Sequence, residues 1–173
     1  MTVLILGSPM AAADYHACQA ILKETPPGSA LERLILRKLR HATPAADSDI
    51  DPLLVTINSR VEFQIDDEAP QTRILVRNGF RNGLVGLTLL ITTARGMAML
   101  GLRAGQSFAF DENGRTRTVT VRNVPYQPQA ARLGRRPAAR TGNASAEVVS
   151  LQTAREDRDH APAWEAAIRR KGT

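Results

Sequence analysis

The side chains that most often carry nucleophilic or metal chemistry are sparse in this sequence, which has three histidines and one cysteine. His16, His41 and His160 are spread along the chain, and neither an H-E-x-x-H nor a C-x-x-C pattern occurs. Zinc and redox sites need such ligands at short spacing. Cys18 has no evident partner base, so we expect a small packed residue rather than a nucleophile. The sequence therefore predicts no metal, no cofactor and no catalytic residue.

An acidic run resembles the start of a calcium loop but does not complete one. Asp47, Asp49 and Asp51 have the opening spacing, but Pro52 stands where the loop needs glycine and Asn58 where it needs a bidentate glutamate. We expect these carboxylates to solvate a linker. The chain also has no G-x-x-x-x-G-K-[ST] run and no dinucleotide-binding glycine pattern, so nucleotide cradling is not predicted.

Positive charge is concentrated at the end of the chain. The formal net charge is +6, and residues 132–173 hold nine basic and five acidic side chains. The basic residues that open this stretch are Arg132, Arg135, Arg136 and Arg140. They predict a flexible basic tail that could bind DNA or RNA through phosphates. The aromatic fraction of 4% disfavours a sheet that stacks bases.

The first third of the chain predicts a helical hairpin. A strand at 2–6 and a turn at 7–9 precede a helix at 10–24, in which apolar residues recur at helical spacing. After the stop at 25–28, Ser29 and Glu32 form a capping-box pattern for a second helix. Residues 43–52, rich in Ala, Pro, Ser and Asp, predict a linker. One cysteine and the lack of a signal segment or of ~20 consecutive apolar residues favour a cytoplasmic protein away from membranes.

The middle of the chain predicts an α+β module. Strands are expected at 54–57, 60–65, 72–77, 84–91, 107–110 and 115–124, with Asn-Gly turn signals at 78–79 and 82–83. Thr93 is the expected N-cap of one short helix that reaches about Leu100, and Gly101 follows in the left-handed region. Residues 129–145 predict flexible chain, with short helices at 147–158 and 163–171.

Three sequence blocks carry a family resemblance. They are V-T-I-N-S-R-V-E-F at 55–63, A-M-L-G-L-R-A-G-Q-S at 98–107 and Y-Q-P at 126–128. These blocks closely resemble the regulator of nucleoside diphosphate kinase (Rnk) family, part of the wider group that shares the C-terminal domain of Gre transcription elongation factors. They occur in the family's order across about half of the chain, and a short hairpin precedes them as in that family.

The resemblance implies a fold and a partner. The fold would be an antiparallel β-sheet with one short helix, like that of FK506-binding proteins (FKBP-like). The implied domains are a hairpin and linker at 1–50, a Gre-factor C-terminal domain at 51–131 and a basic extension at 132–173. The implied partner is bacterial RNA polymerase, bound by a monomer at the rim of its secondary channel with the hairpin pointing inward.

The family's docking segment is a Ser-Pro-x-Gly run at the start of the short helix. It corresponds here to Thr93, Ala94, Arg95 and Gly96, with Ala94 in place of the family's proline. Met97 and Leu100 either extend this face or belong to the core; the sequence leaves both interpretations open.

The hairpin tip bears on transcript cleavage. Gre factors are thought to use paired carboxylates at the tip to hold Mg²⁺, which prefers oxygen ligands. Here the tip contains Lys23, Glu24 and Thr25, with one carboxylate, and the first helix would span only ~21 Å. We therefore predict a transcription regulator that binds the polymerase without being an enzyme, and that competes with Gre factors. Any effect on nucleoside diphosphate kinase would then be transcriptional.

Two alternatives remain open. One is a nucleic-acid-binding protein that acts through the arginine tail. The other is a prolyl isomerase by analogy with the fold, which would need an aromatic pocket drawn from Phe63, Phe80, Phe108, Phe110 and Tyr126.

Overall fold

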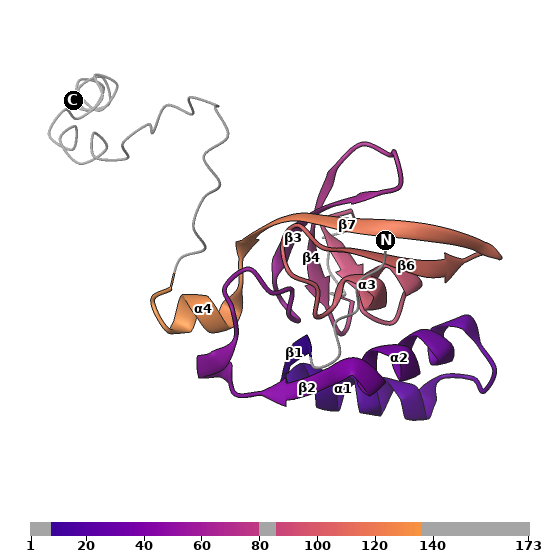
Figure 1. Ribbon diagram of the computed structural model, residues 1–173, viewed down its shortest axis with the longest axis horizontal. Coiled ribbons are helices and arrows are strands. Elements are labelled where there is room, and N and C mark those ends of the chain that lie inside the picture. Colours follow the sequence, from indigo (N-terminus) through magenta and orange to yellow (C-terminus); the bar gives the residue numbers. More distant parts are fainter. Residues whose placement is uncertain (1–7, 80–85, 136–173) are drawn as a thin grey trace, which may run out of the picture. The chain divides into compact units, whose positions relative to one another are not determined.

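The computed structural model describes residues 8–79 and 86–135, and its first feature is the predicted helical hairpin (Figure 1). Helix α1 comprises Ala12–Glu24 and α2 comprises Ala30–His41. The Ser29 hydroxyl caps α2 by accepting from the Glu32 N–H at 3.1 Å, as predicted. The Glu32 carboxylate, however, accepts from the Gly28 N–H at 2.6 Å, one residue before the position that a capping box requires.

Two short strands flank the hairpin where the sequence predicted a turn and a linker. Strand β1 (Ser8–Ala11) pairs in parallel with β2 (Ala42–Ala45), and a 3₁₀ turn, η1, follows at Asp47–Asp49. Both predictions are wrong at these residues. The Ala and Pro side chains of the two segments give no strand signal, whereas the pairing is made by backbone groups that bond to each other. The strand predicted at 2–6 lies outside the described residues.

The main sheet has the order β5-β4-β3-β7-β6 and is curled (Figure 1). Its strands are β3 (Arg60–Ile65), β4 (Gln71–Val76), β5 (Thr88–Leu90), β6 (Ser107–Glu112) and β7 (Arg115–Tyr126). The pairs β3–β4, β3–β7 and β6–β7 are antiparallel, but β5 runs parallel to β4. The sheet is therefore mixed rather than wholly antiparallel, because hydrophobic patterning marks strands without setting their direction.

Most of the local predictions around the sheet are confirmed. Helix α3 comprises Ala94–Met99 and is capped by Thr93, and Gly101 has a φ of 76°. The β6–β7 turn has positive φ at Asn113 and Gly114, as a two-residue hairpin turn requires. The strand predicted at 54–57 is reduced to one bridge between Leu54 and Arg103. The turn signal at 82–83 lies outside the described residues.

Helix α4 (Pro128–Arg132) corrects the prediction of flexible chain from residue 129. Its N-cap is Gln127, whose side-chain oxygen accepts from the Ala130 N–H at 2.9 Å. Gln127, Gln129 and Ala130 are all buried, so this helix is anchored by contacts that its composition does not reveal. The predicted helices at 147–158 and 163–171 lie outside the described residues.

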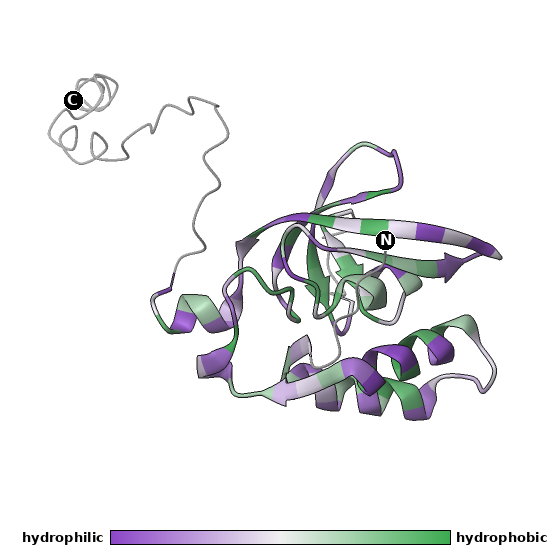
Figure 2. Ribbon diagram, viewed as in Figure 1, coloured by the Kyte–Doolittle hydropathy of each residue, from purple (hydrophilic) through white to green (hydrophobic). Residues whose placement is uncertain are grey.

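One hydrophobic cluster joins the hairpin to the sheet. From the hairpin it includes Cys18, Ile21 and Ile35, and from the sheet the fully buried rings of Phe108 and Phe110. Figure 2 shows apolar residues on the strands and on the hairpin helices. The structure is therefore α+β, with the hairpin packed on the sheet rather than tethered to it. None of the helices in the described ranges has the length and apolar character to span a membrane.

Candidate functional site

The predicted docking segment begins at the capped end of α3. The Thr93 hydroxyl accepts from the Gly96 N–H at 3.2 Å and donates to the Leu90 carbonyl at 2.7 Å. Gly96 lies against the end of β5: a Cβ atom there would be 2.1 Å from the Leu90 carbonyl oxygen. Glycine is therefore needed for α3 to pack this closely, and the predicted N-cap is confirmed.

Arg95 is held in place by acidic side chains from the sheet. Its guanidinium forms a two-point contact with the Glu112 carboxylate, with two N–O distances of 2.8 Å. Glu68 lies 4.0 Å from Arg95. Arg117 pairs with Asp66 and Glu68 and lies 3.7 Å from Glu112, so two arginines and three carboxylates form one network beside α3.

The network shifts the titration of its members. The hydrogen bond from Arg95 is the main cause that lowers the pKa of Glu112, and the same bond raises the pKa of Arg95. The pKa of Asp66 is lowered first by the backbone N–H of Thr118 and then by Arg117. Glu112 and Arg95 therefore both stay charged at neutral pH, and their contact holds the Arg95 side chain in a fixed orientation.

The structure separates the surface residues of the predicted docking segment from its core residues. Gly96, Met97 and Leu100 are buried, so the interpretation of Met97 and Leu100 as core residues applies. Thr93 is exposed, and Ala94 and Arg95 are partly exposed. Only these three side chains of the predicted segment can contact a partner directly.

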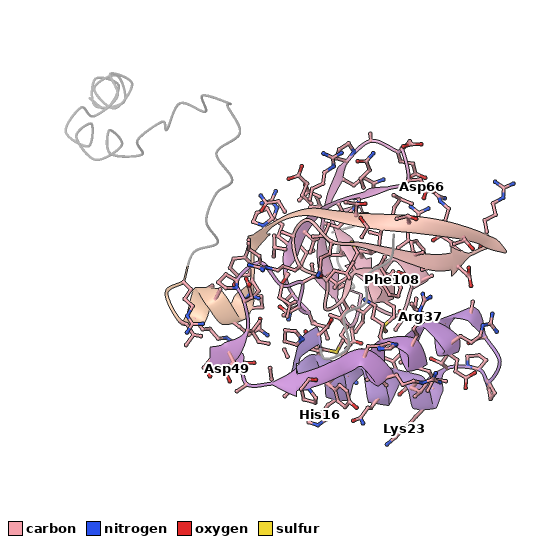
Figure 3. All side chains as sticks on the ribbon, in the orientation of Figure 1. His16, Lys23, Arg37, Asp49, Asp66 and Phe108 are labelled. Carbon is pink, nitrogen blue, oxygen red and sulfur yellow. The ribbon has the colours of Figure 1, made fainter. Side chains whose placement is uncertain are left out.

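The hairpin tip is exposed and has few free carboxylates. Lys23 and Glu24 are exposed at the end of α1, and Figure 3 shows Lys23 pointing away from the sheet. The Thr25 hydroxyl donates to the Ile21 carbonyl at 2.7 Å, which closes the last turn of the helix. Glu32, the next carboxylate, is bonded to the Gly28 N–H. Across the described ranges no group of three or more acidic, His or Cys side chains could hold a metal ion.

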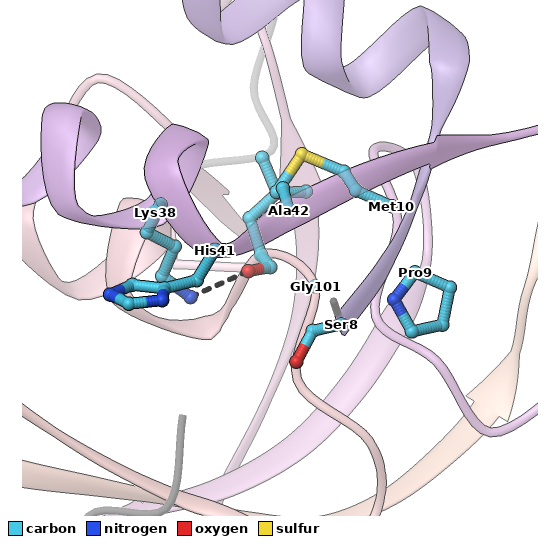
Figure 4. Close-up of a pocket in the computed structure, with 8 residues that line it drawn as sticks. Ser8, Pro9, Met10, Lys38, His41, Ala42 and Gly101 are labelled. Atoms are coloured by element: carbon cyan, nitrogen blue, oxygen red, sulfur yellow. Dashed lines mark hydrogen bonds between the residues drawn. The ribbon is translucent and has the colours of Figure 1, made fainter. Parts of the chain in front are cut away.

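A buried lysine that was not among the predicted site residues connects the hairpin to α3. Lys38 on α2 donates to the carbonyls of Ala98 and Leu100, both at 2.6 Å, and its ammonium lies 4.5 Å from the centre of the Phe108 ring. Figure 4 shows its bond to Leu100 beside His41 and Gly101. Burial is the main cause that lowers the pKa of Lys38, to about 7.

Arg37 adds a second link between α2 and the sheet. Its guanidinium donates to the Ala109 carbonyl at 2.6 Å and lies 4.4 Å from the centre of the Phe108 ring (Figure 3). This bond uses a carbonyl of β6, which is the last strand in the sheet order.

The predicted basic tail begins on the folded part of the chain. Arg132 lies 3.8 Å from the Asp47 carboxylate, and Arg135 donates to the Ser48 carbonyl at 2.8 Å. Asp47, predicted to solvate a linker, thus lies beside α4. Arg136 and Arg140 lie outside the described residues.

Three of the aromatic residues considered for a prolyl isomerase belong to the core instead of lining a pocket. Phe63, Phe108 and Phe110 are at most 2% exposed and fill the core. Tyr126 is about half exposed, and Phe80 lies outside the described residues. Nothing in the described part of the chain therefore favours isomerase activity.

Comparison with known proteins gives likeness in structure alone, since no protein-family profile and no curated protein matches this chain. A prokaryotic transcription elongation factor GreA/GreB from Nitrosomonas europaea matches with a TM-score of 0.52 and 24% identity, over 69% of this chain and 98% of that one. Gfh1 from Thermus aquaticus (TM-score 0.33, 12% identity, 68% and 97% covered) and GreA factor homolog 1 from Thermus thermophilus (0.32, 14%, 66% and 96%) match more weakly. The first likeness shows that this chain shares the fold of that elongation factor.

Proposed function

We propose that this protein is a transcription regulator that binds bacterial RNA polymerase at the rim of the secondary channel. The observation that carries the proposal is the shared fold, which extends over 98% of a solved transcription elongation factor and 69% of this chain. The three sequence blocks that resemble the Rnk family support the same partner. Because one fold can serve many functions, the proposal also rests on the geometry of the site.

The docking face that we propose consists of Thr93, Ala94 and Arg95. The cap at Thr93 and the close approach of Gly96 to Leu90 fix the start of α3. Glu112 fixes the Arg95 side chain, so little conformational entropy remains to be lost when a partner binds. Ala94 in place of the family's proline leaves this cap intact.

We further propose that the bound protein does not stimulate transcript cleavage. The helices of the hairpin have 13 and 12 residues and so span about 20 Å. Their tip offers Glu24 beside Lys23, while the Glu32 carboxylate is already bonded to a backbone N–H. A second Mg²⁺ would find too few oxygen ligands here. Occupying the same rim, the protein would compete with Gre factors.

The binding test compares two arginines of one ionic network. Purified protein is titrated onto core RNA polymerase with and without excess Gre factor, using wild type, Arg95→Ala and Arg117→Ala. Both substitutions break the network, but only Arg95 belongs to the proposed face. We expect Gre-displaceable binding that is weakened by Arg95→Ala at least about tenfold and little changed by Arg117→Ala.

Two outcomes would contradict the proposal. Equal losses in the two variants would mean that the network acts through folding, and binding that Gre factor does not displace would place the contact elsewhere.

The absence of cleavage activity has its own test. Halted elongation complexes with Mg²⁺ are incubated with the protein or with a Gre factor as positive control. Shortened transcripts in the presence of the pure protein would contradict the absence of cleavage activity.

The charge excess of residues 132–173 favours a second candidate, binding of DNA or RNA by the tail. The test is removal of the tail, and the structure indicates where to cut. The chain should end after Gly134, because a cut before Arg132 would shorten α4, whose Gln129 and Ala130 are buried. Salt-sensitive binding to duplex DNA that is lost on this truncation would support the candidate, and retained binding would contradict it.

A further inference from the structure

A polar cavity of about 250 Å³ lies outside the proposed docking face. It is bordered by α1, η1, the turn before β3, the end of β4 and α4. The polar side chains that line it come from Asp14, Asp47, Asn58, Arg77, Gln129 and Arg132. Two carboxylates and two guanidinium groups therefore border one small space.

The deepest of these groups is a carboxylate with one free oxygen. Asp14 is 3% exposed, and its Oδ2 accepts from the Ile57 N–H at 3.1 Å. Among the described residues no hydrogen bond reaches its Oδ1. Burial, partly offset by the Ile57 bond and reinforced by Asp47, raises the pKa of Asp14 to about 6. At neutral pH the group is thus mostly ionised and gains from any donor that enters the cavity.

A second buried residue, Gln129, brings a hydrogen-bond donor to the same cavity. Gln129 is 7% exposed, and its Oε1 accepts from the Thr56 hydroxyl at 2.9 Å. Its amide nitrogen has no partner in the described part of the chain, although this residue also lines the cavity. Asp14 and Gln129 are thus buried residues that each border the cavity and each have one polar atom without a hydrogen bond to the described part of the chain.

The rim of the cavity carries positive charge. Arg77 makes no ion pair or hydrogen bond with any described residue, and Arg132 has only the 3.8 Å contact with Asp47. Both side chains are exposed and can move toward an anion. The cavity therefore offers an acceptor for a cation in its interior and guanidinium groups for an anion at its mouth.

We propose that this cavity binds a free α-amino acid, with the ammonium group on Asp14 Oδ1 and the carboxylate held by Arg132 and Arg77. The cavity volume of about 250 Å³ leaves room for a small amino acid. A nucleotide fits less well because no aromatic side chain lines the cavity for base stacking. A divalent cation fits less well because the two arginines would repel it.

The test uses the purified full chain without polymerase, so it succeeds or fails independently of the proposed function. Isothermal titration calorimetry is run with each of the twenty amino acids, and with ethylamine, acetate and inorganic phosphate as probes of one charge. We expect at least one small amino acid to bind, with ethylamine and acetate each binding at least about tenfold more weakly, since each retains only one of the two charged contacts.

Three variants locate the binding. Asp14→Asn keeps an acceptor for the Ile57 N–H but loses the charge, and Arg132→Gln removes an exposed rim cation; each should weaken binding about tenfold or more. Arg115→Gln, at an exposed position at the start of β7, is the matched control and should bind as wild type. Circular dichroism checks folding, and if Asp14→Asn does not fold, Arg132→Gln decides the question.

Two results would overturn the proposal. One is the absence of any binding heat from the amino acids at millimolar concentration. The other is binding of phosphate as tight as that of any amino acid and unchanged in Asp14→Asn, since this would show an anion site made by the rim arginines alone.

Discussion

The ammonium nitrogen of Lys38 lies 2.6 Å from the carbonyl oxygen of Leu100, which joins the hairpin to the end of α3. The last carbonyls of a helix have no partner within the helix and carry partial negative charge. Lys38 satisfies two of them, since Ala98 is equally close. The helix whose first residues form the proposed docking face is therefore held at its other end by the hairpin.

Replacing this lysine should destabilise the protein. Lys38→Met keeps the length and packing of the side chain but leaves two buried carbonyls without a donor. We expect the free energy of unfolding to fall by about 1–3 kcal/mol, measured by urea denaturation. Arg40→Met, at an exposed position of the same helix, is the control and should change little. A stabilised Lys38→Met would show that the cost of burying the cation exceeds the value of its hydrogen bonds.

The same lysine predicts a rise of stability with pH. Its folded pKa of about 7 is below the ordinary value of 10.5, so the unfolded chain binds more protons between these values. Stability should therefore increase above pH 7, by up to about 1.4 kcal/mol per pH unit from this group. Cys18, whose pKa burial raises from 9.0 to about 11, acts in the opposite direction above pH 9. The window from pH 7 to 9 isolates Lys38, and the slope there should be smaller in Lys38→Met.

Gly96 should tolerate no side chain. In Gly96→Ala the Cβ would be 2.1 Å from the Leu90 carbonyl oxygen and 2.8 Å from its carbon, both backbone atoms that move only with β5. We expect destabilisation of about 3 kcal/mol or more, seen as a lower Tm, because overpacking forces the backbone apart. Gly79→Ala is the matched control, since nothing lies within 4 Å of its added Cβ. A native-like Tm for Gly96→Ala would contradict this packing.

Local sequence signals predicted much of the fold. The Ser29 and Thr93 caps, the turn at Asn113 and Gly114, and strands such as Arg60–Ile65 each follow from neighbouring residues. The parallel pairings β1–β2 and β4–β5 could not be predicted in this way, because they depend on where distant segments meet. The short helix α4 was missed for the same reason: its stability comes from buried glutamines that bond to residues far along the chain.

The candidate sites were predicted less completely. The segment at 93–96 was found through a family resemblance, but only the structure shows which side chains face outward. The spacing of Lys38 and Asp14 in the sequence could have identified them as buried residues. Lys38 is three residues after Ile35 and four after Leu34, and Asp14 is seven residues before Ile21. A charged residue at such a spacing lies on the apolar face of its helix and must be buried with partners.

Glu112 should stabilise the protein through Arg95. We expect Glu112→Gln to lower the free energy of unfolding by about 1 kcal/mol at pH 7 and low salt, and by less at high salt, because the pair is only partly buried. The pKa of Glu112 is lowered in the folded state, so its contribution is present above pH 4.5 and is lost as the pH falls. Urea denaturation at several pH values measures this. Glu62→Gln, which breaks no ion pair among the described residues, is the control.

Asp14 should destabilise the protein at neutral pH, which is the reverse of Glu112. Its folded pKa of about 6 exceeds the ordinary value of 3.8, so the folded chain binds more protons between these values. Its contribution to stability is therefore present below about pH 4 and is lost as the pH rises through 6. Asp14→Asn should raise the free energy of unfolding at pH 7 by about 1–3 kcal/mol and abolish this part of the pH dependence. Denaturation of wild type and variant at pH 4.5 and 7, with Asp49→Asn at an exposed position as control, measures the difference. Functional residues often cost stability, so a stabilised Asp14→Asn would support the proposed binding site. A variant less stable than wild type at pH 7 would remove that support.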